Sequence, residues 1–275
     1  MAALLETAGR LTQLNALSPL DGRYFDQVKE LSSFVSEGAL IRTRFEVEAR
    51  YLLALSNPAI GLVRPFNEQE TDFLTHIGQN LTVNQVERVK QIEDTTRHDV
   101  KAVEKAFREI AAGTSFEDTM EMIHFGLTSE DVNNLAYRLM LKRASDEVCL
   151  PAITRVVDTL VDMADKYKGL PMLARTHGQP AVPTTMGKEI ANVAVNIHRE
   201  TLSLQAVKLT GKVNGAVGNY NSLYFTYPEI DWIKFSKKFI ESLGFSANLL
   251  TTQINYYEDI IEYFQIIRRI KICRN

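Results

Sequence analysis

The chain has 275 residues, of which 45% are hydrophobic and 24% charged, and its formal net charge is −3 at pH 7. These proportions are typical of a soluble globular protein with room for one large domain or two ordinary ones. Nucleic-acid-binding domains are usually basic, so we expect no nucleic-acid partner. No apolar run is long enough to cross a bilayer, so we expect no membrane partner either.

The start of the chain, MAALLETAGRLTQ, has an early Glu6 and no basic start followed by an apolar core, so it is not a secretory signal, and we interpret residues 1–13 as a flexible lead-in. The two cysteines, Cys149 and Cys273, give neither a disulfide framework nor a metal-ligand spacing. This usage is typical of a reducing compartment, which predicts a cytoplasmic protein. The five histidines show no pair at metal-binding spacing, so we expect no metal and no cofactor.

Helical patterns fill the first part of the chain. Apolar residues recur at helical spacing from Glu37 to Ser56, where Asn57-Pro58 ends the run. Two capping boxes and a His-Asp pair predict three further helix starts, at Asn67, Thr82 and His98-Asp99. The last of these helices should end near Gly113. We therefore predict a small helical domain over residues 14–113.

The helices predicted beyond residue 113 are longer. Thr128-Ser129-Glu130-Asp131 is a helix-start signal, and Pro151 should kink or restart the helix that continues to Gly169. A second long helix is expected from Thr184 to about Gly211, with apolar residues close to heptad spacing. A shorter helix should follow over residues 228–243. No segment alternates with a period of two, so the prediction is an all-α protein whose second region is a helix bundle.

A proline-rich segment, LPMLARTHGQPAVPTTMGKE over residues 170–189, separates the two long helices. Proline and glycine keep the backbone out of a helix, so its polar side chains should lie on a shaped loop, the kind of segment that often carries catalytic groups. The polar side chains are those of Arg175, Thr176, His177, Gln179 and Lys188. Taken alone, this loop favours a structural histidine satisfied by loop hydrogen bonds over a catalytic one.

Two polar clusters coincide with predicted helix starts. His98 lies beside Asp99, which indicates either a functional pair or a capping Asp with a surface histidine. Thr128-Ser129 lies where free backbone N–H groups and the helix dipole favour an anion, although capping alone explains it equally well. Neither cluster decides a function by itself.

The segment GKVNGAVGNYN, residues 211–221, holds three glycines among three asparagines. A phosphate-binding P-loop is excluded because Lys212 is followed by Val, and no strand is predicted before it, as a dinucleotide fingerprint requires. The composition favours a tight loop whose backbone and amide donors face a polar ligand. Charge-assisted binding of an anion could come from Arg23, Lys101, Lys188 and Lys212.

Five motifs occur in order along the chain: SPLDGRY, TTRHDVKAVE, HFGLTSEDVNNLAYRLMLK, ARTHGQPAVPTTMGKE and GKVNGAVGNYN. Together they resemble the bacterial-type adenylosuccinate lyases, which belong to the fumarase/aspartase superfamily. The resemblance runs from about Leu14 to Ile254. DGRY and GKVNGAVGNYN favour this family over argininosuccinate lyase, fumarase or aspartase. The resemblance implies a long-helix bundle and a homotetramer whose sites are assembled from neighbouring subunits.

The resemblance implies a β-elimination that releases fumarate from adenylosuccinate, leaving AMP, and from the succinyl-aminoimidazole-carboxamide ribotide of purine synthesis. Such chemistry needs a base, an acid for the departing nitrogen, and donors for the anionic groups. By position, His177 would be the general acid and His98 would assist it. Arg23 and Tyr24 would hold the nucleotide end, and Thr128 and Ser129 a carboxylate. The remaining implied substrate contacts are Arg97, Asp99, Thr176, Lys212, Asn214 and Gln253.

Three departures from the family pattern stand out. Arg97 replaces the usual Asn, and Asn255-Tyr256-Tyr257-Glu258 replaces Glu-Pro-His-Asp. The family's Ser-Ser-x-Met-Pro-x-Lys-x-Asn loop, whose serine is the proposed base, does not occur in these 275 residues. We therefore interpret residues 114–275 as an incomplete bundle with a divergent tail from about residue 255, and expect no turnover by this chain alone. A truncated gene model, a frameshift and a true short paralogue all fit.

The tail INYYEDIIEYFQIIRRIKICRN predicts a helix with a broad apolar stripe, which needs a cover that nothing later in the sequence supplies. This stripe and the absent base leave other functions open. The chain could be a non-catalytic helical paralogue that binds the nucleotide or a full-length subunit, or an unstable fragment. Another lyase of the superfamily, such as argininosuccinate lyase, is a further alternative.

Overall fold

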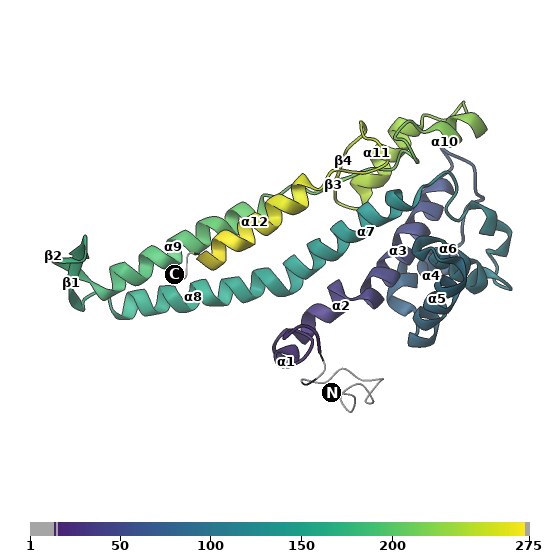
Figure 1. The fold of residues 1–275 in the computed structure, drawn as a ribbon. Helices are drawn as coiled ribbons and strands as arrows, with labels where there is room; N and C mark the ends of the chain where they lie inside the picture. The colour runs from purple at the N-terminus through teal and green to yellow at the C-terminus, as the bar shows by residue number, and fades with distance from the viewer. Residues whose placement is uncertain (1–13, 15, 273–275) are drawn as a thin grey trace. The chain divides into compact units, whose positions relative to one another are not determined.

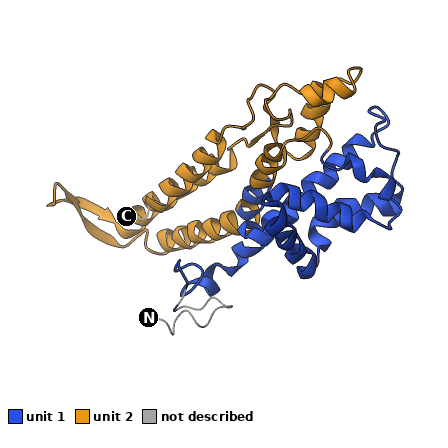
Figure 2. Ribbon diagram, turned by 45° about the vertical axis from the view of Figure 1, so that its right-hand side comes forward, with its two compact units in different colours: residues 1–124, 139–144 blue, residues 125–138, 145–275 orange. Residues whose placement is uncertain are grey.

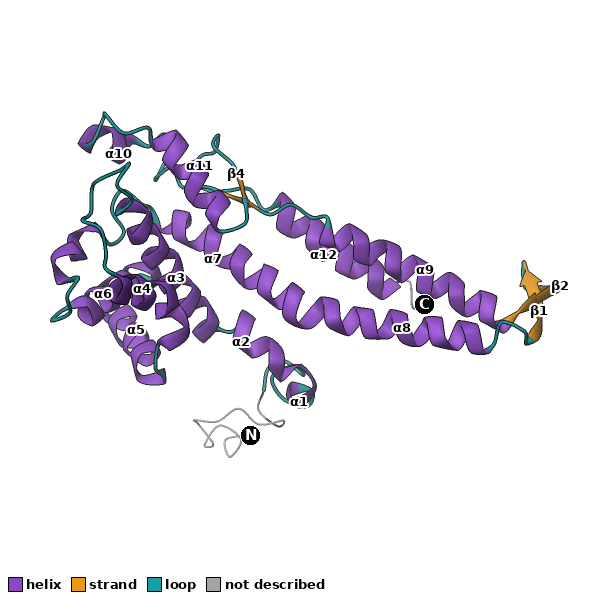
Figure 3. Cartoon of the chain, turned by 180° about the vertical axis from the view of Figure 1, so that it is seen from behind, coloured by secondary structure: helices purple, strands orange, loops and turns teal. Residues whose placement is uncertain are grey.

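The computed structural model describes residue 14 and residues 16–272, so the lead-in expected over residues 1–13 lies outside the described residues. Helices dominate the part of the chain that is described (Figure 3), which confirms the predicted all-α class. The chain divides into two compact units (Figure 2). Unit 1 comprises residues 1–124 and 139–144, and unit 2 comprises residues 125–138 and 145–275.

Unit 1 is a cluster of helices of which four are long. Its elements are α1 (Phe25–Val28), a 3-10 turn (Lys29–Leu31), α2 (Ser32–Val35), α3 (Glu37–Leu55), α4 (Glu68–Asn80), α5 (Val83–Thr96), α6 (Asp99–Ala111) and a 3-10 turn (Glu117–Met122). Both predicted capping boxes are present, at Asn67 and Thr82. Helix α3 packs against α4 and α6, with Phe45 and Phe107 in the core at a ring separation of 5.6 Å.

The structure extends unit 1 beyond residue 113, where the sequence predicts a boundary. Residues 114–124 fold back onto α4 and the loop before it. The Arg64 guanidinium forms ion pairs with Asp118 and Glu70, at 2.8 and 2.9 Å, and Phe116 is buried with its ring 5.4 Å from that of Phe73. These contacts join residues far apart in sequence, so a local pattern does not show them.

Unit 2 is built on long helices. Its elements include the first part of α7 (Ser129–Ala144), a π-helical turn (Ser145–Cys149), α8 (Leu150–Lys166), α9 (Met186–Gln205), α10 (Asn221–Thr226), α11 (Trp232–Ser242) and α12 (Glu258–Ile272). Pro151 lies in the first turn of α8, where its missing N–H costs nothing, so the predicted restart is confirmed. Helix α9 packs along α8 and α12 (Figure 1). It ends earlier than predicted because β3 (Thr210–Gly211) pairs with β4 (Ser246–Ala247).

The proline-rich segment is an antiparallel hairpin of β1 (Pro171–Thr176) and β2 (Gln179–Thr185), rather than an irregular loop. His177 and Gly178 form its two-residue turn with φ angles of 49° and 75°, the positive values that such turns need at both central residues. Each strand of a two-stranded ribbon is an edge, so prolines are tolerated in it. Because prolines are typical of loops, the composition of this segment predicts a loop, and that prediction was wrong.

The apolar stripe of the C-terminal helix is only partly covered. Tyr263 and Ile266 of α12 are buried, whereas Ile261 and Phe264 keep 53% and 56% of their surface exposed. In the described residues, no helix is both long and apolar enough to span a membrane.

Candidate functional site

His177 occupies the tip of the β1–β2 hairpin. It and Thr176 are exposed, and His177 adopts a left-handed backbone conformation that a residue with a Cβ rarely takes. Such conformations cost on the order of 1–2 kcal/mol and persist where the surrounding fold demands them. The hairpin lies at the end of α8 and α9 opposite β3 and β4 (Figure 1), so its tip projects from unit 2.

A buried ion pair lies at the other end of unit 2. Asp131 and Lys212 have no exposed side-chain surface, and their Oδ1 and Nζ atoms are 3.0 Å apart. Lys212 Nζ also donates to the backbone carbonyls of Gly215, at 2.9 Å, and Gln253, at 2.7 Å. The three donors of the ammonium group are thus matched by three acceptors inside the protein.

The glycine-rich loop is packed against the segment before α12. Asn214 is fully buried, and its amide donates to Thr251 Oγ1 at 2.8 Å. Gly218 has φ +79°, and a Cβ there would lie 2.1 Å from the Thr251 carbonyl oxygen. This close approach explains why glycine is needed at that position.

The start of α7 joins the same cluster. Thr128 N–H donates to Asp131 Oδ2 at 2.9 Å, and the Asp131 N–H donates to the Thr128 carbonyl at the same distance. Thr128 and Ser129 are half-buried, and the Gln253 side chain is exposed. The structure therefore brings together Thr128, Lys212, Asn214 and the backbone of Gln253, with Ser129 next in sequence.

His98, not Asp99, caps α6: its Nδ1 accepts the Lys101 N–H at 3.2 Å, so a neutral ring carries its proton on Nε2. Asp99 instead forms an ion pair with Arg44 of α3. Burial opposes ionisation of Asp99, but the Arg44 charge and the hydrogen bonds from Val100 N–H and Arg44 outweigh it, so the pKa of Asp99 lies below its ordinary value. Exposed Arg97 ends α5 with φ 53°.

Arg23 and Tyr24 lie just before α1. The guanidinium carbon is 5.0 Å from the ring centroid, a cation–π contact between two exposed residues. Within unit 1, the predicted site residues thus form two local groups, Arg23 with Tyr24, and His98 with its sequence neighbours.

Within unit 2, the hairpin tip and the Asp131–Lys212 cluster are far apart. Helix α9 has 20 residues and connects the hairpin to β3, so it separates them by about 30 Å at 1.5 Å per residue. A single nucleotide-sized ligand cannot contact both places in one chain. His177 and Thr176 are therefore not brought to the other predicted contacts of unit 2.

Several ionisable residues in these regions are absent from the predicted set. Tyr257 O–H donates to Glu130 Oε1 at 3.1 Å beside the start of α7. Burial raises the pKa of Glu130, and burial together with the Glu130 carboxylate raises the pKa of Tyr257 to about 12. The departure of residues 255–258 from the family pattern was the only sequence signal that pointed to Tyr257.

A second unpredicted pair, His124 and Glu48, lies in unit 1. His124 Nδ1 is 2.5 Å from Glu48 Oε1, and the glutamate side chain is fully buried. Burial opposes protonation of the imidazole, but the Glu48 charge and hydrogen bond outweigh it and raise the pKa of His124. His124 begins the motif HFGLTSED, yet its partner lies on α3, so the pairing could not be read from the sequence.

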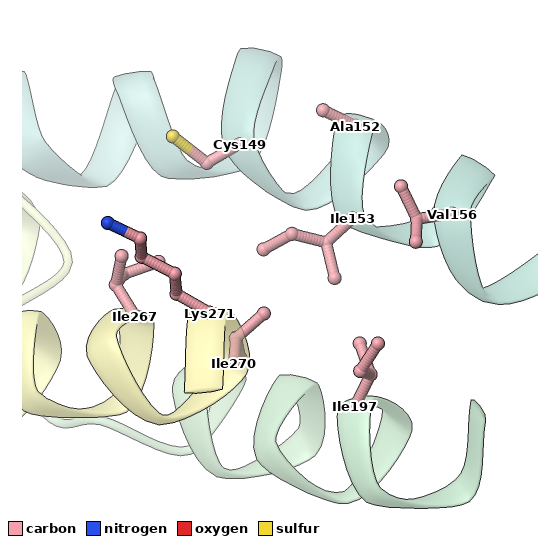
Figure 4. A pocket seen from close by; sticks show the side chains of 8 residues that line it. All are labelled: Cys149, Ala152, Ile153, Val156, Ile197, Ile267, Ile270 and Lys271. Carbon is pink, nitrogen blue, oxygen red and sulfur yellow. The ribbon is translucent and has the colours of Figure 1, made fainter. Parts of the chain in front are cut away.

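A hollow of about 360 Å³ lies between α8, α9 and α12 (Figure 4). Its lining is apolar apart from one ammonium group and one thiol: Cys149, Ala152, Ile153, Val156, Ile197, Ile267, Ile270 and Lys271. It includes none of the predicted site residues and offers no acid–base pair for an elimination. Among the described residues, no group of three or more His, Cys, Asp or Glu side chains could hold a metal ion.

Comparisons with known proteins place these features in a family. The model of a family described as "Lyase" matches residues 22–272. The chain is 47% identical to adenylosuccinate lyase of Haemophilus influenzae, over 94% of this chain and 58% of that protein, and 45% identical to that of Escherichia coli K12, over 94% and 57%. The chain thus spans less than two thirds of the length of the curated relatives it matches.

Solved structures give the same fold at lower identity. A fumarate lyase from Mesorhizobium sp. BNC1 has a TM-score of 0.71 at 19% identity, over 90% of this chain and 54% of that one. A β-carboxy-cis,cis-muconate cycloisomerase from Acinetobacter calcoaceticus sp. ADP1 has a TM-score of 0.68 at 18% identity, over 88% and 54%. At this identity the likeness concerns the fold alone.

Proposed function

The chain belongs to the lyase family whose model matches residues 22–272, and we propose that it supplies the acid and the substrate-binding residues of an adenylosuccinate lyase. The reaction is the release of fumarate from adenylosuccinate and from the succinyl-aminoimidazole-carboxamide ribotide, two steps of purine nucleotide biosynthesis. The names and identities of the relatives support this substrate class. The proposed setting is the cytoplasm.

The elimination needs a proton removed beside a carboxylate while the carbon–nitrogen bond breaks and the nitrogen gains a proton. We propose that His177 protonates the departing nitrogen, because its side chain is exposed at the hairpin tip and histidine is the residue that most often serves as a general acid. The Thr128 and Ser129 hydroxyl groups at the start of α7 bind a succinyl carboxylate, and the helix dipole favours the anion there. Arg23 and Tyr24 bind the nucleotide end, and His98 assists.

The observation that carries this proposal is the distance of about 30 Å that α9 places between the His177 tip and the Asp131–Lys212 cluster. Within one chain the two cannot serve one substrate, whereas a projecting tip can enter the site of a second copy. We therefore propose a homo-oligomer, a tetramer as the resemblance implies, in which each site combines residues from different chains.

None of the residues named above is proposed as the catalytic base. These 275 residues contain no Ser-Ser-x-Met-Pro-x-Lys-x-Asn run, so we propose that the base is supplied by residues beyond them. Fumarate release tests this: a protein limited to these 275 residues should be inactive, and addition of a C-terminal portion of a relative should restore turnover. Robust turnover by the unaided chain would mean that another of its residues acts as the base.

A second function is favoured by the exposed apolar side chains of α12, which suit a non-catalytic protein that binds the nucleotide or a full-length subunit. Calorimetric titration with AMP separates the two functions. If AMP binds to the wild-type chain and to a His177→Ala variant alike, and fumarate release is never restored, the binding function stands and His177 is a structural turn residue.

A further inference from the structure

We propose that the buried Asp131–Lys212 ion pair is a positioning device, which fixes the start of α7, the glycine-rich loop and the segment before α12 in one arrangement without touching the substrate. This inference rests on the proposed function, in which Thr128 and Ser129 bind a succinyl carboxylate, and on the substrate contact that the resemblance implies for Gln253. It reassigns Lys212, which the sequence places among the substrate contacts, to a role behind them.

The Asp131 carboxylate collects donors from two of these segments. Its Oδ2 accepts from Thr128 N–H at 2.9 Å and from Gly215 N–H at 3.1 Å. Its Oδ1 accepts from Asn214 N–H at 3.1 Å and faces Lys212 Nζ at 3.0 Å. Four donors saturate a carboxylate, so Asp131 has no acceptor capacity left for water or a ligand.

Lys212 adds the third segment. Its ammonium group links Asp131 to the carbonyl of Gln253, at 2.7 Å, and closes the loop on the carbonyl of Gly215, at 2.9 Å. The Gln253 carbonyl accepts a hydrogen bond from Lys212, while the Gln253 side chain is exposed. The pair thus fixes the backbones of the residues that are accessible to a ligand, while it is itself fully buried.

Stability alone does not explain such a pair, since a buried ion pair is often no more stabilising than apolar residues of similar volume. The pair instead favours one arrangement of the three segments. Each of its hydrogen bonds holds one backbone group of one segment, and an arrangement that broke the pair would leave a buried charge without its partner, which is costly. A shift of the α7 start relative to Gln253 would break at least one of these bonds. The geometry therefore favours the positioning role.

The same unit offers a matched control, the buried ion pair of Arg138 and Asp259. Arg138 Nε and one guanidinium NH₂ donate to the two Asp259 oxygens at 2.8 and 2.7 Å, and the two side chains are 0% and 8% exposed. This pair joins α7 to α12, and Arg138 also donates to the carbonyls of Asn134 and Tyr256, but neither residue of the pair is hydrogen-bonded to Thr128, Gly215 or Gln253. Arg138→Met and Lys212→Met each leave one buried carboxylate without its cation.

The experiment titrates fumarate into the full chain by calorimetry and compares wild type, Lys212→Met and Arg138→Met at a temperature where circular dichroism shows all three folded. We expect Lys212→Met to weaken fumarate binding at least tenfold and Arg138→Met to change it less than twofold, although both lower the melting temperature. Equal loss in the two variants, or unchanged binding by Lys212→Met, overturns the proposal.

Two outcomes call for a second measurement. If the wild-type chain binds no fumarate, the proposed function fails for this chain, and hydrogen exchange then tests the positioning role alone. Faster amide exchange of residues 128–131 and 251–253 in Lys212→Met than in Arg138→Met supports it, and equal exchange overturns it. If Lys212→Met does not fold, the double variant Asp131→Asn/Lys212→Met, which removes both charges, takes its place in the same two assays. Weaker fumarate binding or faster amide exchange than in Arg138→Met then supports the proposal, and no difference overturns it.

Discussion

His177 and Lys212 lie beyond opposite ends of α9, a helix of 20 residues that is about 30 Å long. One residue is exposed on a two-residue turn and the other is fully buried in an ion pair. The first can act only on a ligand held outside its own hairpin, and the second only through the residues that it holds in place.

The first prediction concerns the acid. In a mixture that releases fumarate, His177→Ala should lower kcat by about 10²–10⁴-fold, the usual contribution of a positioned acid. Val182→Ala is the control, because Val182 is 74% exposed on the same hairpin and its aliphatic side chain cannot donate a proton. Steady-state kinetics would argue against the acid role if the two variants were equally active.

The second prediction concerns the close approach at Gly218. Gly218→Ala should destabilise the chain by about 2 kcal/mol or more, because the new methyl group meets the Thr251 carbonyl in addition to the strain of a positive φ. Gly113 also has a positive φ, of 75°, but nothing lies within 4 Å of a Cβ there, so Gly113→Ala should cost about 1 kcal/mol. Denaturant unfolding measures both, and an equal cost would mean that the Gly218 contact relaxes freely.

The third prediction is a pH dependence in unit 1. Hydrogen bonds from Arg64 are the largest influence that lowers the pKa of Glu70, from 4.5 to about 2, against the opposing effect of burial. When folding lowers the pKa of a carboxyl group, the ionised group stabilises the folded protein at pH values above the unfolded-state pKa. This stabilisation is lost as the pH falls through the folded-state pKa. The stability difference between wild type and Glu70→Gln should therefore be constant above about pH 5 and shrink between pH 4.5 and pH 2.

The control for this dependence is Glu121→Gln, since Glu121 is 88% exposed in its ion pair with Arg108. Urea unfolding across the acid range should show little difference between this variant and wild type, because exposed pairs contribute little. A Glu70→Gln difference that stays constant down to pH 2 would show that the carboxylate is not held ionised by Arg64.

The fourth prediction concerns the segment after residue 254. Asp259→Asn should cost about 3–5 kcal/mol, because it leaves the fully buried Arg138 without its counter-charge. Glu262→Gln, on the same helix at an exposed ion pair, should be nearly neutral. Thermal unfolding followed by circular dichroism compares the two; equal melting temperatures would show that α12 is not anchored through Asp259.

That anchoring bears on what the sequence could and could not reveal. Residues 255–258 depart from the family pattern and were expected to begin a divergent tail. In the structure Asn255 is fully buried, with hydrogen bonds that reach Asn134 and Thr210, and the family model matches through residue 272. The pattern of four residues showed a difference but not the partners that accommodate it, which lie on α7 and β3.

The predictions that the structure confirms rest on interactions between residues that are close together in the sequence. The Asn67 and Thr82 capping boxes join residues three apart, and Pro151 acts on its own helix turn. The hairpin was predicted as a loop because prolines are typical of loops. The Asp131–Lys212 pair was missed because it joins segments distant in the sequence, and only the fold shows that a lysine predicted to bind substrate is enclosed.

The shared site is tested most directly by fumarate release in a reconstituted mixture. The chain is combined with a separately made C-terminal portion of the Haemophilus influenzae relative, the part beyond the region that this chain matches. We predict no turnover by either part alone, turnover in the mixture, and its loss when the chain carries His177→Ala. Full turnover by the chain alone, or a mixture indifferent to His177→Ala, would contradict the account.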